Sequence, residues 1–161
     1  MQEIWPHLIG MAICLVLSAF FSASETAFSS LNKTRLKTMV EDNKKAALAL
    51  YLAEQYDRLI STILIGNNIV NISIASIGTV LFVKVVGDMG ATVSTVVVTV
   101  AVLIFGEITP KSIAKDCPER FAMFAAPVLR LLIWVMAPLN FLFSLWKKLL
   151  KLLFRSSEEE G

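Results

Sequence analysis

Residues 90–111 read GATVSTVVVTVAVLIFGEITPK, and they set a single carboxylate, that of Glu107, at the end of a long apolar run. The fifteen residues 90–104 carry no charge, and Pro110 follows Glu107 by three positions. An α-helix rises ~1.5 Å per residue, so a run of this length nearly crosses a hydrocarbon layer ~30 Å thick. The pattern predicts a transmembrane helix, and an ionisable residue inside such a helix is a functional candidate.

The whole chain has the composition of a membrane protein. Of its 161 residues, 56% are hydrophobic and 17% are charged, whereas soluble domains are about half apolar and a quarter charged. Three long stretches contain no Asp, Glu, Lys or Arg, namely Ile4–Ser24, Leu59–Val83 and Met89–Gly106. We therefore expect an all-α membrane protein with three transmembrane helices, at about 4–31, 59–85 and 90–113.

The distribution of Lys and Arg predicts how these helices are oriented. Six lie between the first and second predicted spans and eight lie at or after the end of the third, whereas Lys84 alone separates the second from the third. Cytoplasmic loops carry an excess of Lys and Arg. The sequence thus predicts a multi-pass protein of the cell's inner (plasma) membrane, with the N-terminus outside and the C-terminus cytoplasmic.

Two segments outside the spans are also expected to be helical. Residues 33–57 show apolar residues at helical spacing on both sides of EDNKK (41–45), which favours a cytoplasmic helical hairpin over a solvated connector. Residues 118–155 combine aromatic and basic residues, as is typical of an amphipathic juxtamembrane belt helix at the inner interface. A fourth span at 121–146 is the alternative, and it would have to accommodate Arg130 and Pro138.

Each predicted span contains polar residues near its inner half. Ser18 and Ser22 in the first span lie four residues apart, and so do Asn67 and Asn71 in the second. Residues at i and i+4 share one face of a helix, so each pair can point at one spot. The ~1.5 Å rise places both pairs and Glu107 in the inner half of the membrane, where they are expected to converge.

Pro110 suggests why Glu107 occurs where it does. Proline has no N–H, so the carbonyl of Gly106, four residues earlier, loses its helical partner. Gly106 and Gly66 lack side chains, so an ion or a backbone can approach them closely. Carboxylate, hydroxyl, amide and carbonyl oxygens are the ligands of hard cations, and Mg²⁺ prefers about six of them.

Structural roles are the alternative for the same residues. Serines are common at helix–helix contacts in membranes, and asparagines can link helices by hydrogen bonds. Glu107 can also form an ion pair with Lys111, four residues on. As a set, the residues favour a cation site.

Three motifs carry a resemblance to a known family. LSAFFSASETAFSSL (17–31), LIGNNIVN (64–71) and FGEITPK (105–111) resemble the transmembrane domain of the CorC/CNNM magnesium transporters. The resemblance implies a homodimer with three transmembrane helices per subunit, a belt helix, and cytosolic CBS domains that bind ATP. It implies Mg²⁺ export, with Na⁺ as the proposed driving ion. The implied ion site comprises Ser18, Ser22, Asn67, Asn71 and Glu107, with carbonyls from Gly66 or Gly106.

The expected organisation is a CorC/CNNM-type transmembrane domain at 1–155, followed by the start of a linker at 156–161. CBS domains are absent from the chain, which is either part of a longer protein, as the ending SSEEEG favours, or a stand-alone version. The expected function is Mg²⁺ transport, and the alternative is a membrane scaffold that senses Mg²⁺ without conducting it. An enzyme is not expected, because the sequence has no Ser–His–Asp set, HExxH or Gly-rich phosphate loop. No nucleic-acid partner is expected.

Overall fold

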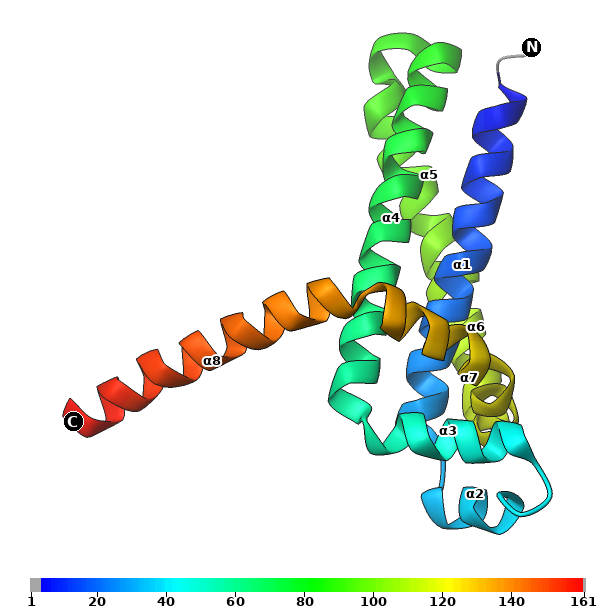
Figure 1. Ribbon diagram of the computed structural model, residues 1–161. Helices are drawn as coiled ribbons and strands as arrows, with labels where there is room; N and C mark the ends of the chain where they lie inside the picture. The colour runs from blue at the N-terminus through cyan, green and yellow to red at the C-terminus, as the bar shows by residue number, and fades with distance from the viewer. Residues whose placement is uncertain (1–3, 161) are drawn as a thin grey trace.

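The computed structural model describes residues 4–160, with side chains through Arg155, and all the regular structure in that part of the chain is helical. Figure 1 shows an upright bundle with two short helices at its foot and one long helix projecting from its side. In chain order the elements are α1 (Trp5–Ser30), α2 (Lys33–Met39), α3 (Lys44–Glu54), α4 (Tyr56–Val86), a 3₁₀ turn (Gly87–Met89), α5 (Gly90–Ala101), a π-helix (Val102–Ile108), α6 (Thr109–Asp116), α7 (Pro118–Val135) and α8 (Ala137–Glu160).

Within the described residues, two helical segments are long and apolar enough to cross a membrane, Trp5–Ser30 and Tyr56–Asp116. The second segment doubles back at the 3₁₀ turn, so α4 and α5 lie antiparallel side by side (Figure 1). Gly87 makes this reversal at a φ of 85°, a conformation that favours glycine. A Cβ on Gly90 would overlap the backbone of Val83, so a glycine is also needed where the two helices touch.

Asparagine caps start the two helices at the foot of the bundle. The Oδ1 atom of Asn32 accepts hydrogen bonds from the backbone N–H groups of Thr34 and Arg35, and Asn43 caps α3 by accepting from Lys45. Such caps satisfy donors that have no partner within the helix. Glu119, at the start of α7, accepts from the Asn32 backbone N–H at 3.3 Å and so fixes α7 to the beginning of α2.

The core of the foot is built largely from alanines. Small side chains let helices approach closely, which suits a bundle packed by van der Waals contact. The fully buried alanines come from α1, α3, α6 and α7: Ala27, Ala46, Ala49, Ala114, Ala122, Ala125 and Ala126. Leu36, Leu52 and Leu129 fill the spaces between them.

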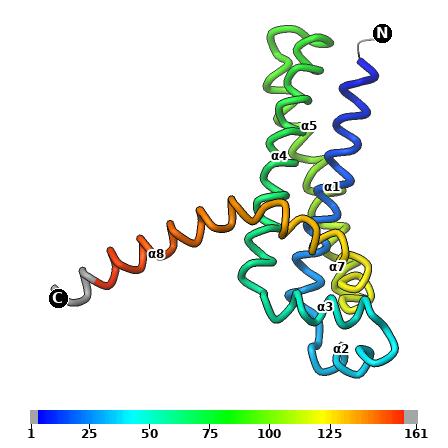
Figure 2. Tube along the Cα trace, viewed as in Figure 1, coloured from blue at the N-terminus to red at the C-terminus, as the bar shows by residue number. Residues whose placement is uncertain are grey.

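The region expected to form one belt helix consists of two helices, α7 and α8, which are bent by 70° at Met136. Beyond the bend α8 runs away from the bundle (Figure 2). Asn140 Nδ2 donates to Thr62 Oγ1 at 2.9 Å, which fixes the start of α8 to α4. By length and composition the bent pair also qualifies as a broken span, so a belt helix and a further crossing both remain interpretations of this region.

Candidate functional site

Three side-chain oxygens from two helices converge inside the bundle. Ser18 Oγ on α1 lies 2.9 Å from Asn71 Oδ1 and 3.4 Å from Asn67 Oδ1, both on α4. A serine hydroxyl has one proton to donate, so it cannot satisfy both amide oxygens at once. The shorter distance assigns that proton to Asn71. The spot therefore gathers hydroxyl and amide oxygens, which are ligands of hard cations.

Helix periodicity and burial explain this convergence. Asn67 and Asn71 are one turn apart on α4, so their side chains point the same way. Ser18 faces them with no exposed surface. The structure thus brings together three residues that the sequence predicted would meet.

The third predicted span reaches the same place through Gly106. A Cβ on Gly106 would lie 2.9 Å from Ser18 Oγ, so the backbone of this residue packs directly beside the hydroxyl. Gly106 lies within the π-helix Val102–Ile108, in which Thr109 N–H donates to Ile104 O, five residues back. Short π-helical segments inside α-helices occur frequently at functional sites.

Pro110 removes a hydrogen-bond donor from this stretch of backbone. It cannot donate to the carbonyl of Gly106, as an α-helix would require, nor to that of Phe105, as a π-helix would require. Irregular backbone of this kind is tolerated within a membrane when it is enclosed by protein or lines a cavity.

Ser22 supplies a further buried oxygen. Its side chain is fully buried, and its Oγ has no hydrogen-bond partner among the described residues. Ser24, two residues on, instead donates to the carbonyl of Phe20 at 2.7 Å, which is the usual arrangement for a serine in a helix. Buried hydroxyls are normally hydrogen-bonded, so Ser22, one turn below Ser18, is a further candidate ligand.

Glu107 lies next to Gly106 in the chain, but its carboxylate pairs with Lys111. Lys111 Nζ and Glu107 Oε2 are 3.3 Å apart, and the Glu107 side chain is 25% exposed. This is the ion pair that the sequence offered as an alternative role. The two residues are one helical turn apart, so the ammonium group of Lys111 compensates the charge of this carboxylate.

Gly66 has a packing role that the sequence did not reveal. A Cβ at this position would come within 2.5 to 2.7 Å of the Phe21 ring, so an aromatic side chain of α1 occupies the space beside it. Its contribution of a carbonyl to an ion site remains a prediction. In the part of the chain that the structure describes, no three His, Cys, Asp or Glu residues group together. Neutral oxygens thus form the cluster.

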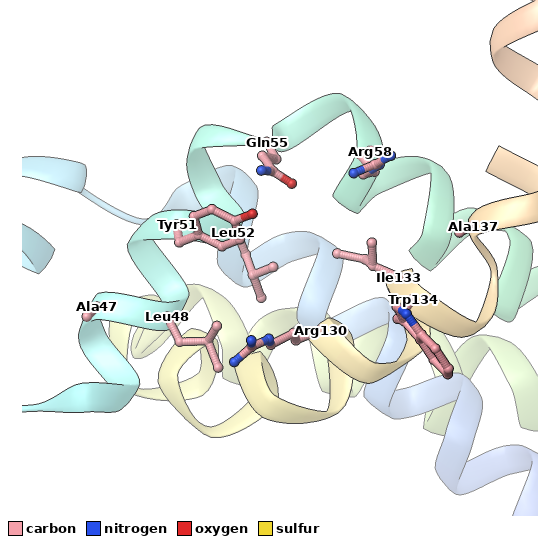
Figure 3. Close-up of a pocket in the computed structure, with 10 residues that line it drawn as sticks. All are labelled: Ala47, Leu48, Tyr51, Leu52, Gln55, Arg58, Arg130, Ile133, Trp134 and Ala137. Atoms are coloured by element: carbon pink, nitrogen blue, oxygen red, sulfur yellow. The ribbon is translucent and has the colours of Figure 1, made fainter. Parts of the chain in front are cut away.

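A separate cavity of about 690 Å³ lies at the foot of the bundle, between α3, α4 and α7 (Figure 3). Arg58 and Arg130 line it, and none of the predicted site residues does. In the sequence, Arg130 stands out only as a charge that a span at 121–146 would have to accommodate. A cavity between three helices depends on how they pack together, and this cannot be predicted from a local sequence pattern.

Comparison with known proteins identifies the family. A model described as the cyclin M transmembrane N-terminal domain matches residues 9–161. The chain belongs to the cyclin M (CNNM) family. The resemblance to the CorC/CNNM transmembrane domain is thereby confirmed.

Several bacterial and plant proteins share this cyclin M domain. A UPF0053 protein of Haemophilus influenzae is 43% identical over 139 residues, covering 86% of this chain and 33% of that protein. The UPF0053 inner membrane protein YfjD of Escherichia coli is 42% identical over 127 residues, covering 78% and 30%. A chloroplastic DUF21 domain-containing protein of Arabidopsis thaliana is 35% identical over 112 residues, covering 70% and 17%. The chain spans about a third of the length of the two bacterial relatives.

Proposed function

We propose that this cyclin M domain carries Mg²⁺ outward across the inner membrane, driven by Na⁺, as a homodimer. Three crossings per subunit place the N-terminus outside and the C-terminus in the cytoplasm. The name of the Escherichia coli relative, an inner membrane protein, supports this location. In a longer chain, CBS domains that bind ATP would follow α8.

The convergence of Ser18 Oγ with Asn67 Oδ1 and Asn71 Oδ1 is the observation that carries the proposal. These oxygens are hard ligands of the kind that Mg²⁺ prefers. Mg²⁺ could bind several of these oxygens at once. The buried Oγ of Ser22 and the carbonyl of Gly106 provide further ligands from the same region.

Glu107 would supply the negative charge that a set of neutral oxygens lacks. Its carboxylate is paired with Lys111. An arriving divalent cation competes with that ammonium group, so ion binding would be coupled to a rearrangement in the last turns of the third span. The π-helix and Pro110 make this part of the backbone the natural point for such a movement, as in transporters that use discontinuous helices.

The decisive test compares Glu107→Gln with the parental protein in sealed liposomes that contain a Mg²⁺ dye. We expect the parental protein to move Mg²⁺ in dependence on a Na⁺ gradient and Glu107→Gln to lose this flux while remaining folded. Glu54→Gln is the matched control, because Glu54 is exposed on α3, far from the oxygen cluster in sequence. Flux through Glu107→Gln at the parental rate would remove Glu107 from the site.

Adding a calorimetric measurement of Mg²⁺ binding separates transport from sensing. If the purified protein binds Mg²⁺ but gives no flux in liposomes, it is a regulatory scaffold. Parallel runs with Co²⁺ and Mn²⁺ would establish the order of preference among divalent ions.

A further inference from the structure

The cavity between α3, α4 and α7 carries two positive charges and no compensating negative one. Arg58 comes from α4 and Arg130 from α7, and both side chains are exposed along its edge (Figure 3). None of the described residues that line the cavity is acidic, and neither arginine has an ion-pair partner in the described part of the chain. Two guanidinium groups that border one cavity favour an anionic occupant.

The remainder of the lining is both polar and apolar. Tyr51 and Gln55 offer a hydroxyl and an amide, while Leu48 and Ile133 provide hydrocarbon surface. Trp134, which is 77% exposed, stands at the edge of the cavity. An occupant that satisfies this lining has a negatively charged polar part and an apolar part.

The protein surface beside the cavity is also apolar. Leu131 is 60% exposed and Val135 is 57% exposed, and each follows a cavity-lining residue of α7 by one position. The arginines belong to the end of the bundle where the cationic residues of the sequence predict the cytoplasmic side. An exposed tryptophan is also typical of the membrane–water interface.

We infer that the cavity binds the headgroup of an anionic phospholipid from the inner leaflet. Both positive charges attract the phosphate into the cavity, where a planar guanidinium group can form two parallel hydrogen bonds to phosphate oxygens. The acyl chains lie along the exposed apolar face of α7. Basic pockets between helices on the cytoplasmic side are suited to such headgroups.

A second copy of the chain is a poorer occupant. Its projecting helix, α8, carries Lys147, Lys148 and Lys151, which have the same sign as the two arginines. An anionic lipid supplies both a negative charge to pair with the arginines and hydrocarbon to cover the exposed apolar residues. This inference does not depend on the proposed transport of Mg²⁺.

Quenching of Trp134 fluorescence by brominated lipids tests the inference. Trp5→Phe and Trp146→Phe leave Trp134 as the single tryptophan, and the protein is placed in vesicles that contain brominated phosphatidylglycerol or brominated phosphatidylcholine. We expect phosphatidylglycerol to quench preferentially. The double variant Arg58→Gln/Arg130→Gln should lower that preference about five-fold or more, the order expected for basic residues near an anionic surface.

The matched control is Lys148→Gln/Lys151→Gln, which removes two charges from α8 at residues that line neither this cavity nor the pocket that Arg58 shares with Lys147. It should keep the preference. An equal fall in both double variants would indicate general attraction to the surface and would overturn the inference. Absence of quenching by either lipid would show that protein covers the cavity, which also overturns it. Native mass spectrometry of the unmodified chain gives a second readout, because bound phosphatidylglycerol should be retained there and lost from Arg58→Gln/Arg130→Gln.

Discussion

Ser18 Oγ on α1 lies 2.9 Å from Asn71 Oδ1 on α4, a hydrogen bond between residues 53 positions apart in the chain. It joins two candidate membrane helices at a spot where Asn67 Oδ1 is also only 3.4 Å from the same hydroxyl. The geometry suits both helix packing and the proposed cation binding. Substitutions that separate these two roles are therefore the informative ones.

Asn71→Leu should weaken Mg²⁺ binding by at least about ten-fold, the lower figure known for residues that merely support a metal ligand. It should cost about 0.6–1.7 kcal/mol in the free energy of unfolding, the range for hydrogen bonds between membrane helices. Asn68→Leu is the control, since Asn68 is exposed and adjacent in sequence. Calorimetric titration with Mg²⁺ and denaturant unfolding in mixed micelles give the two numbers. If Asn71→Leu and Asn68→Leu bind Mg²⁺ equally well, Asn71 has only a packing role.

Gly106→Ala should destabilise the bundle by about 1–3 kcal/mol, the usual cost of overpacking. The added Cβ would lie 2.9 Å from Ser18 Oγ and 3.4 Å from Ser18 Cβ. Removing the hydroxyl in Ser18→Ala relieves the shorter contact, so the double variant should recover part of the loss. Denaturant unfolding of the two single variants and the double variant measures this coupling. If the effects of the two single variants on stability simply add, the added Cβ does not clash with the Ser18 hydroxyl, and the two helices instead move apart locally.

The sequence predicted the long apolar helices well because their signal is local. The helix expected at 4–31 is α1, Trp5–Ser30, and its limits follow from a run of apolar residues. The helix expected at 90–113 is less regular, since α5 gives way to a π-helix before α6. Pro110 indicated a disturbance there, but the form that it takes depends on how the backbone packs against Ser18.

The candidate site was predictable where it rests on periodicity and unpredictable where it rests on packing. The i,i+4 spacing of Asn67 and Asn71 indicates a common direction, and the structure adds that Ser18 is what they face. No pattern could reveal that Ser22 Oγ is buried without a partner, because every serine in a helix has a carbonyl four residues back. The contact between Gly66 and Phe21 likewise depends on the relative rotation of α1 and α4.

Lys111→Gln should tighten Mg²⁺ binding by up to about five-fold, since a partly exposed ion pair contributes about 0–1 kcal/mol. The ammonium group lies 3.3 Å from Glu107 Oε2 and competes with any cation for that oxygen. The effect should shrink as the ionic strength rises, because salt screens exposed charges. Lys115→Gln, one turn further along, is the control. Weaker binding in Lys111→Gln would instead mean that Lys111 positions the carboxylate for the ion.

Thr62→Val should destabilise the protein more than Asn140→Leu does, although both remove the same hydrogen bond between α4 and α8. Asn140 Nδ2 donates to Thr62 Oγ1, while Asn140 Oδ1 is already buried without a partner. Thr62→Val leaves both polar atoms of the amide unsatisfied, at about 1–3 kcal/mol for the newly orphaned donor. Asn140→Leu removes the orphaned oxygen together with the donor, and Thr62 Oγ1 retains its bond to the carbonyl of Arg58.

A double-mutant cycle in denaturant completes this comparison. Thr62→Val/Asn140→Leu should be about as stable as Asn140→Leu alone, because the valine then faces an apolar neighbour. The coupling energy should then equal the cost of Thr62→Val alone, about 1–3 kcal/mol. Equal costs for the two single variants, with no coupling, would mean that the contact contributes nothing to fixing α8 against α4. In that case the direction in which α8 leaves the bundle would have to be set by the 70° bend at Met136 alone.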